Sequence, residues 1–174
     1  MGNKKILKIM VSISLILAAF VSVNVFANTP EDKESEMVLK QQDALANNKK
    51  IQDKLKDRKD FEARLGGKYI DEEGKLHVNF VGYINSIPED MKLAGVEYHS
   101  VAYTLEELQA IMDTLRDHYK ELGDMGAGID ESLNKVLIEI DTGNTEVIEK
   151  IKKLVNPEAI EIKHRDPNMK ITFF

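Results

Sequence analysis

The serines are the first candidates for chemistry in this chain, because nucleophilic hydrolysis requires a serine or cysteine held beside a base. The chain has no cysteine. Four serines follow the apolar N-terminal segment, and none lies in the Gly-x-Ser-x-Gly context that exposes a nucleophile on a sharp turn. They are Ser35, Ser86, Ser100 and Ser132. We therefore expect no catalytic residues, and we expect that the protein is not an enzyme.

The four histidines, His77, His99, His118 and His164, lie singly along the chain. No His-Glu-x-x-His spacing offers a metal site. A lone histidine on a strand or helix surface is the ordinary case, so the sequence predicts no metal ligand.

Two acidic pairs could imitate the paired carboxylates of a glycosidase. Glu72-Glu73 and Asp130-Glu131 both lie at polar turns, where solvated carboxylates are common. A loose glycine cluster lacks the lysine and helix start that phosphate binding requires. These glycines are Gly123, Gly126 and Gly128. The sequence thus predicts no cofactor.

The N-terminal segment has the pattern of a secretory signal peptide. Lys4, Lys5 and Lys8 precede an almost wholly apolar run from 11 to 23, and Val25-Phe26-Ala27 is an A-x-A-like cleavage site. We expect cleavage after Ala27, secretion, and no membrane attachment afterwards. An uncleaved membrane anchor is the alternative, although the run is shorter than the ~20 apolar residues that a span needs.

The charge of the remaining chain argues against a nucleic-acid partner. All 30 acidic residues but only 21 of the 24 basic ones follow residue 27, which gives residues 28–174 a formal net charge of −9. The length of residues 28–174 suits one domain or two small ones. We expect a monomer when no partner is present.

Residues 28–65 are predicted to form a polar helical arm. Charged and amide side chains dominate, and the apolar residues are widely spaced, so we expect a thin apolar stripe and weak docking on the rest. A separate small helical subdomain that contacts a partner is the alternative. Asn47-Asn48 could separate two helices, and Gly66-Gly67 is expected to end the arm.

Residues 124–164 are predicted to form a hairpin, a helix and a strand. Val136, Ile138 and Ile140 alternate with polar residues, as in a half-buried strand. Thr145 could cap the helix that follows, and Asn156-Pro157 ends it. A last strand contains Ile160 and Ile162.

Residues 66–103 are predicted to form a first small sheet that resembles the second. Ile70-Asp71-Glu72 matches Ile129-Asp130-Glu131, and the outgoing strand alternates Leu76, Val78 and Phe80. These matches indicate an internal repeat, although acidic turns before alternating strands are also common. The first unit has room for only one or two helical turns before the strand at 96–103.

Residues 104–123 are predicted to form one long helix between the two units. Thr104-Leu105-Glu106-Glu107 is a capping box, and Gly123 ends the helix. We expect this amphipathic helix to bridge the two sheets and to pack under one or both of them. The predicted fold is α+β: a helical arm, two small antiparallel ββαβ-like units joined by this helix, and a tail at 165–174.

Several segments in order resemble one known family. They are Gly66-Gly67-x-Tyr69-Ile70-Asp71-x-x-Gly74-x-Leu76-x-Val78, then Val96 to Tyr103, the capped helix, and Gly128-Ile129-Asp130 with Val136 to Ile140. Across Phe61 to Lys163 the chain resembles the prodomain of secreted chymotrypsin-like serine proteases of the α-lytic protease and streptogrisin type, of Gram-positive bacteria.

The resemblance implies a folding assistant and inhibitor of such a protease. In the family a protease domain follows the prodomain, and the expected function departs from that pattern because it would be carried out without one. In that family the last small sheet abuts a protease hairpin, and the tail enters the active-site cleft. The residues that would bind the protease are Val136, Ile138, Ile140, Ile160, Ile162, Phe173 and Phe174. Two alternatives stay open: the remnant of a truncated protease precursor, or an extracytoplasmic structural or peptide-binding module unrelated to proteases.

Overall fold

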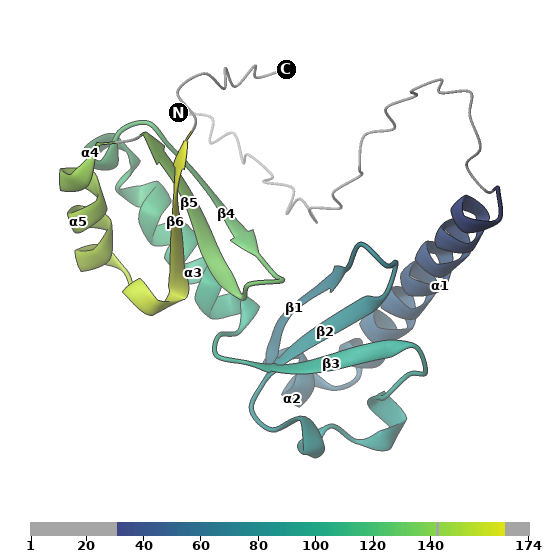
Figure 1. Cartoon of the computed structure of the whole chain (residues 1–174). Helices are drawn as coiled ribbons and strands as arrows, with labels where there is room; N and C mark the ends of the chain where they lie inside the picture. The colour runs from purple at the N-terminus through teal and green to yellow at the C-terminus, as the bar shows by residue number, and fades with distance from the viewer. Residues whose placement is uncertain (1–30, 142, 166–174) are drawn as a thin grey trace, which may run out of the picture. The chain divides into compact units, whose positions relative to one another are not determined.

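The computed structural model describes residues 31–141 and 143–165. These residues form an α+β structure with two small sheets (Figure 1). The predicted signal peptide and most of the predicted tail lie outside the described residues.

The first part of the chain builds one three-stranded sheet and the helices that cover it. Its elements are α1 (Glu31–Lys56), α2 (Lys59–Glu62), β1 (Leu65–Ile70), β2 (Leu76–Val81), η1 (Ile84–Ser86), η2 (Glu89–Met91) and β3 (Val96–Val101). The second part repeats this order with a longer helix between its last two strands. Its elements are α3 (Leu105–Asp117), α4 (Tyr119–Leu122), β4 (Met125–Asp130), β5 (Lys135–Asp141), α5 (Thr145–Leu154), η3 (Pro157–Ala159) and β6 (Ile160–Arg165).

Both sheets have the same mixed topology, which confirms the predicted repeat. In each, a hairpin pairs its strands antiparallel and the third strand then joins the middle strand in parallel, in the orders β1-β2-β3 and β4-β5-β6. Equivalent pairs are Leu76 with Val96 and Val136 with Ile160. The expectation of wholly antiparallel units thus holds only for the hairpins, because a crossover connection returns the third strand in the same direction.

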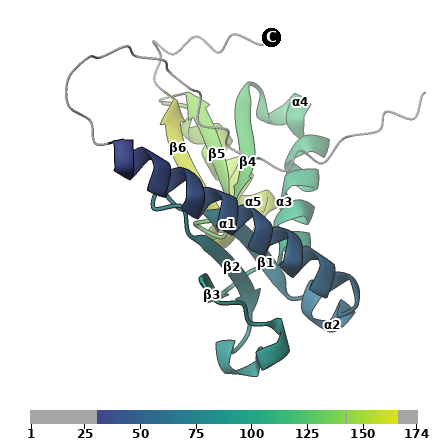
Figure 2. The same cartoon turned by 90° about the vertical axis from the view of Figure 1, so that its right-hand side faces the viewer.

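The helical arm packs tightly against the first sheet, which corrects the prediction of weak docking. Helix α1 lies across this sheet (Figure 2). Ile51 is fully buried and Leu55 is 4% exposed, in one cluster with Val78 and Phe80 of β2. The helix also runs unbroken through Asn47-Asn48. Few apolar residues suffice here because they recur on one side of the helix, facing the sheet.

The helix after Thr104 joins the two units, packs mainly under the second sheet and also contacts β1 of the first, which agrees with the prediction. Leu108, Leu115 and Leu122 pack in one buried cluster with β5 and α5. The capping box at Thr104 forms as predicted, but the helix is interrupted at His118, which separates α3 from α4.

Two further sequence predictions fail locally. Gly66-Gly67 lies inside β1, at a shift in strand register, and does not end the arm. Thr145 is the first residue of α5, and its N-cap is Asn144, without a capping side-chain bond. None of the helices described between residues 31 and 165 is long and apolar enough to cross a membrane.

Candidate functional site

The predicted docking residues of β5 and β6 belong mainly to the interior of the second unit. Val136, Ile138 and Ile140 have no exposed surface, and Ile160 is 6% exposed. Ile162 is half-buried against the same cluster. Alternate side chains of these strands face α3 and α5, so the buried ones belong to the interior, and docking of a partner on this sheet through its edges stays a prediction. Phe173 and Phe174 lie outside the described residues.

The free edges of the second sheet are β4 and β6, since β5 lies between them. Natural edge strands are usually blunted by charges, prolines or bulges that discourage pairing with another chain. Strand β6 carries Glu161, Lys163 and Arg165. In the first sheet, β1 has an irregular register at Gly67, and β3 carries Glu97.

Strand β4 lacks such protection from Met125 to Ile129. Its sequence there is Met-Gly-Ala-Gly-Ile, and it pairs with β5 in a regular register. A Cβ atom placed on Gly128 would meet nothing within 4 Å. Glycine in a strand often marks a place where another backbone approaches closely. Of the four strand edges in the described part of the chain, β4 is the one best suited to receive an added strand.

An apolar groove runs between this edge and α3. It has a volume of about 230 Å³ and is lined mainly by apolar groups of Met112, Leu115, Tyr119, Met125 and Ala127. Gln109 and Arg116 complete the lining. Tyr119 is 52% exposed. The edge therefore offers backbone groups, and the groove beside it offers a place for a side chain of the incoming strand.

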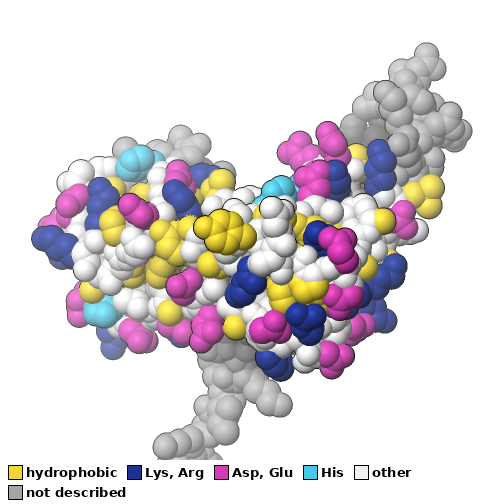
Figure 3. Space-filling model, turned by 90° about the horizontal axis from the view of Figure 1, so that it is seen from below, with side chains coloured by type: hydrophobic (Ala, Val, Ile, Leu, Met, Phe, Trp, Pro, Cys, Tyr) yellow, Lys and Arg dark blue, Asp and Glu magenta, His cyan; other side chains and the backbone are white. Residues whose placement is uncertain are grey.

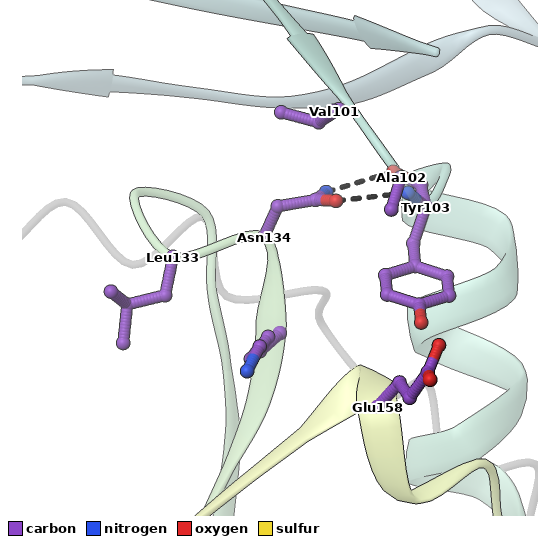
Figure 4. Close-up of a pocket in the computed structure, with 7 residues that line it drawn as sticks. Val101, Ala102, Tyr103, Leu133, Asn134 and Glu158 are labelled. Atoms are coloured by element: carbon purple, nitrogen blue, oxygen red, sulfur yellow. Dashed lines mark hydrogen bonds between the residues drawn. The ribbon is translucent and has the colours of Figure 1, made fainter.

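A second, more open pocket lies where the β4–β5 turn meets the segment between β3 and α3. It has a volume of about 330 Å³ and is lined by Val101, Ala102, Tyr103, Leu133, Asn134, Lys135 and Glu158 (Figure 4). The Asn134 side chain points at the backbone of Tyr103 and forms hydrogen bonds with it and with the backbone oxygen of Gly66. Its amide thus joins parts of the fold and is not available to a ligand.

The turn beside this pocket also docks on β1. The Glu131 carboxylate accepts a hydrogen bond from the backbone N–H of Lys68, and its backbone oxygen accepts one from the Asn79 side chain at 2.6 Å. A Cβ on Gly67, whose φ is +137°, would lie 2.8 Å from Cβ of Glu131. Glycine is required at this position because both the backbone angle and the close approach exclude a side chain.

The structure brings together two of the histidines that the sequence shows as isolated. His77 of β2 and His99 of β3 lie on the face of the first sheet that turns away from α1, with Nδ1 of His77 2.8 Å from Nε2 of His99. On its other side, Nε2 of His77 lies 2.9 Å from Oδ2 of Asp71. A carboxylate only accepts, so Nε2 of His77 donates to Asp71, and in a neutral ring Nδ1 is left as an acceptor.

Carboxylates surround this pair. Glu97 places Oε2 3.5 Å from Nδ1 of His77 and 3.8 Å from Nε2 of His99, while Lys75 binds Oε1 of the same carboxylate. The hydrogen bond from Lys75 lowers the pKa of Glu97. Burial raises the pKa of Asp71, but the hydrogen bonds from His77 and from the amides of Lys75 and Glu73 outweigh it, and the net shift is downward. Both carboxylates are therefore ionised at neutral pH.

Sequence reasoning missed this cluster because its members are spread over the hairpin and a strand some twenty residues later. The available signal was the alternation of polar residues: His77 and Asn79 share a face of β2, and Glu97 and His99 share a face of β3. Only the parallel pairing of β2 with β3, which puts His77 opposite Glu97, joins them.

Three of the serines form hydrogen bonds within their own part of the fold. The hydroxyls of Ser86 and Ser100 donate to backbone oxygens of Tyr83 and Gly82, and that of Ser132 binds Asp130. The face of the molecule in Figure 3 carries acidic and basic side chains intermixed with small apolar groups.

No family model matches the chain, and comparison with curated proteins gives no match.

Proposed function

We propose that the protein is a secreted, non-catalytic, prodomain-like module that binds a chymotrypsin-like serine protease as its inhibitor, its folding assistant or both. The edge of β4 would accept an extended strand of the protease. The observation that carries this proposal is the unprotected edge of β4 beside the apolar groove against α3. The partner class comes from the sequence resemblance.

Strand addition supplies affinity and selectivity by different means. Backbone hydrogen bonds along Met125 to Ile129 would hold any extended segment, whereas the groove selects side chains. In an added strand alternate side chains point to the same side of the sheet, so every second residue faces the groove. An apolar residue packed against Met112 and Tyr119 is the natural occupant.

Inhibition kinetics test this proposal. Residues 28–174 are incubated with a secreted chymotrypsin-like protease of the same organism, and the inhibition constant is measured for the wild type and two tyrosine variants. Tyr119→Ala removes one wall of the groove and is expected to weaken inhibition at least about tenfold. Tyr83→Ala removes a more exposed tyrosine, at 87%, in the first unit, and is expected to leave inhibition unchanged.

A third variant, which lacks residues 170–174, separates the edge from the tail. If the tail enters the protease cleft, its removal weakens inhibition of catalysis more than it weakens binding measured by calorimetry. Absence of both binding and inhibition with the wild type would contradict the proposal.

The same edge and groove would also suit a peptide-binding module with no protease partner. That alternative predicts binding of extended apolar peptides that depends on Tyr119, together with no effect on protease activity. The two functions are therefore distinguished in the same series of variants.

A further inference from the structure

The first sheet holds three potential metal ligands on two neighbouring strands. Nδ1 of His77, Nε2 of His99 and a carboxylate oxygen of Glu97 all lie within 4.8 Å of one another. Their separations are 2.8 Å between the two nitrogens, and 3.5 Å and 3.8 Å from Oε2 of Glu97 to each of them. They form the one group of this kind found in the described residues.

These distances are close to those of a tetrahedral metal site. Bonds of about 2.0 to 2.1 Å from a zinc ion to nitrogen and oxygen place two ligands roughly 3.3 Å apart. The two distances to Glu97 therefore need to shrink slightly, and the nitrogens need to separate by about half an ångström. The movable ring is His99, since its side chain is 40% exposed on an edge strand, whereas that of His77 is 10% exposed.

The surroundings hold His77 in the orientation that a ligand needs. Asp71 accepts from Nε2 of His77, which leaves Nδ1 turned toward His99 and Glu97. Tyr69 stacks on the His77 ring with planes 3° apart and centroids 4.6 Å apart. Metal-binding histidines commonly donate their second ring N–H to a carboxylate, which fixes the ring and strengthens the ligand.

The Asp71 side chain is itself fixed by the hairpin turn. Its Oδ1 accepts hydrogen bonds from the backbone N–H groups of Glu73 at 3.0 Å and Lys75 at 2.8 Å. Lys75 occupies Oε1 of Glu97 and leaves Oε2 toward the histidines. The charged groups that face the cluster are thus Asp71, Glu97 and Lys75, which together carry a net negative charge that favours a cation.

We propose that His77, His99 and Glu97 bind a divalent transition-metal ion of the zinc type, with Asp71 as the residue that orients His77. Two imidazoles and one carboxylate suit zinc, copper, nickel or cobalt, and do not suit magnesium, which prefers oxygen ligands. Three protein ligands leave a fourth position for water or for a group supplied by another molecule. Binding replaces the hydrogen bond between the histidines, and the proton on Nε2 of His99 moves to Nδ1 of the same ring, which frees Nε2 for the ion.

Titration calorimetry with zinc chloride and the purified protein tests this site. The expected result is one ion per chain. His99→Gln and Glu97→Gln are each expected to weaken zinc binding by more than about 100-fold, and Asp71→Asn by about 10 to 100-fold. His164→Gln changes an exposed histidine of β6 and is the matched control, expected to bind as the wild type does.

Cobalt provides a readout that a simple surface histidine would not give. Cobalt bound in a tetrahedral site absorbs strongly in the visible range, and this absorption is expected in the wild type and in His164→Gln but not in His99→Gln. Equal binding of zinc by the wild type and His99→Gln, an equal loss in His164→Gln, or equal affinity for magnesium would overturn the proposal. Far-ultraviolet circular dichroism of each variant confirms that it is folded.

Discussion

The Asn134 side chain pairs with the backbone of Tyr103 through two hydrogen bonds, in the manner of one strand with another. The Tyr103 N–H donates to Oδ1 at 2.9 Å, and Nδ2 donates to the Tyr103 oxygen at 2.8 Å. Nδ2 also donates to the backbone oxygen of Gly66 at 3.0 Å. Asn134 is 5% exposed, with a φ of +52°. One amide at the tip of the β4–β5 hairpin therefore ties it to β1 and to the segment that leads into α3.

Replacement of this amide is expected to be costly. Asn134→Ala leaves one buried and two half-buried backbone groups without their bonds and puts alanine in the left-handed region, so we expect a loss of about 2 to 4 kcal/mol in the free energy of unfolding, measured by urea denaturation. Leu133→Ala in the same turn is the control, and is expected to change stability by less than about 0.5 kcal/mol because Leu133 is 49% exposed. Equal stability of the two variants would contradict the role assigned to Asn134.

The repeat explains why asparagine stands at this position. Gly74 occupies the equivalent place before Lys75 in the first hairpin and has a φ of +79°. Glycine and asparagine are the residues that most readily adopt this conformation. The sequence match between the turns predicted the two hairpins, but the bonds from Asn134 to Gly66 and Tyr103 join residues far apart in sequence and had no local signal.

A pH dependence follows from the turn that Asp130 organises. Burial raises the pKa of Asp130, but the hydroxyl of Ser132, the amides of Leu133 and Ser132 and the charge of Lys163 outweigh it, so the net shift is downward. A carboxyl whose folded pKa lies below its unfolded value of about 3.9 stabilises the fold above that pH, and this contribution disappears as the pH falls through the folded pKa.

Asp130→Asn is therefore expected to lose about 0.5 to 1 kcal/mol at pH 7 and to match the wild type near pH 2. Urea denaturation at pH 7, 5, 3 and 2 measures this difference. Ser132→Ala removes one donor to the same carboxylate and should show a smaller difference with the same trend. A difference between Asp130→Asn and the wild type that is constant with pH would exclude the mechanism.

The sequence predicted local features better than contacts between distant segments. The strand β2, the alternating burial in β5 and the capping box at Thr104 depend on neighbours within a few residues, and each of these predictions is confirmed. The direction of β3 and β6 and the pairing of His77 with His99 depend on which strand lies beside which. The burial of Ile51 could not be predicted from the thin apolar stripe of its helix either, because the surface that buries it belongs to β2.

The role of α1 as a cover for the first sheet makes a direct prediction. Ile51→Ala removes a side chain with no exposed surface and is expected to lower the free energy of unfolding by about 2 to 5 kcal/mol. Leu39→Ala in the same helix removes a side chain that is 61% exposed and should change stability by less than about 0.5 kcal/mol. Thermal or urea denaturation of both variants checks this, and a weakly docked arm would give similar small values for the two.

The choice of β4 over β6 as the docking edge can be tested by adding a charged side chain to β4 and removing one from β6. Ala127→Lys gives β4 the kind of protection that edge strands normally have, and Lys163→Ala removes that protection from β6. Because both side chains are exposed, neither change should alter the free energy of unfolding by more than about 0.5 kcal/mol.

Binding to the protease is expected to weaken at least about tenfold in Ala127→Lys, since the lysine loses hydration when a strand pairs beside it. Lys163→Ala should bind as the wild type does, measured by calorimetry or by the inhibition constant. If instead Lys163→Ala changes binding and Ala127→Lys does not, the protease pairs with β6, and the groove beside Tyr119 has no part in recognition.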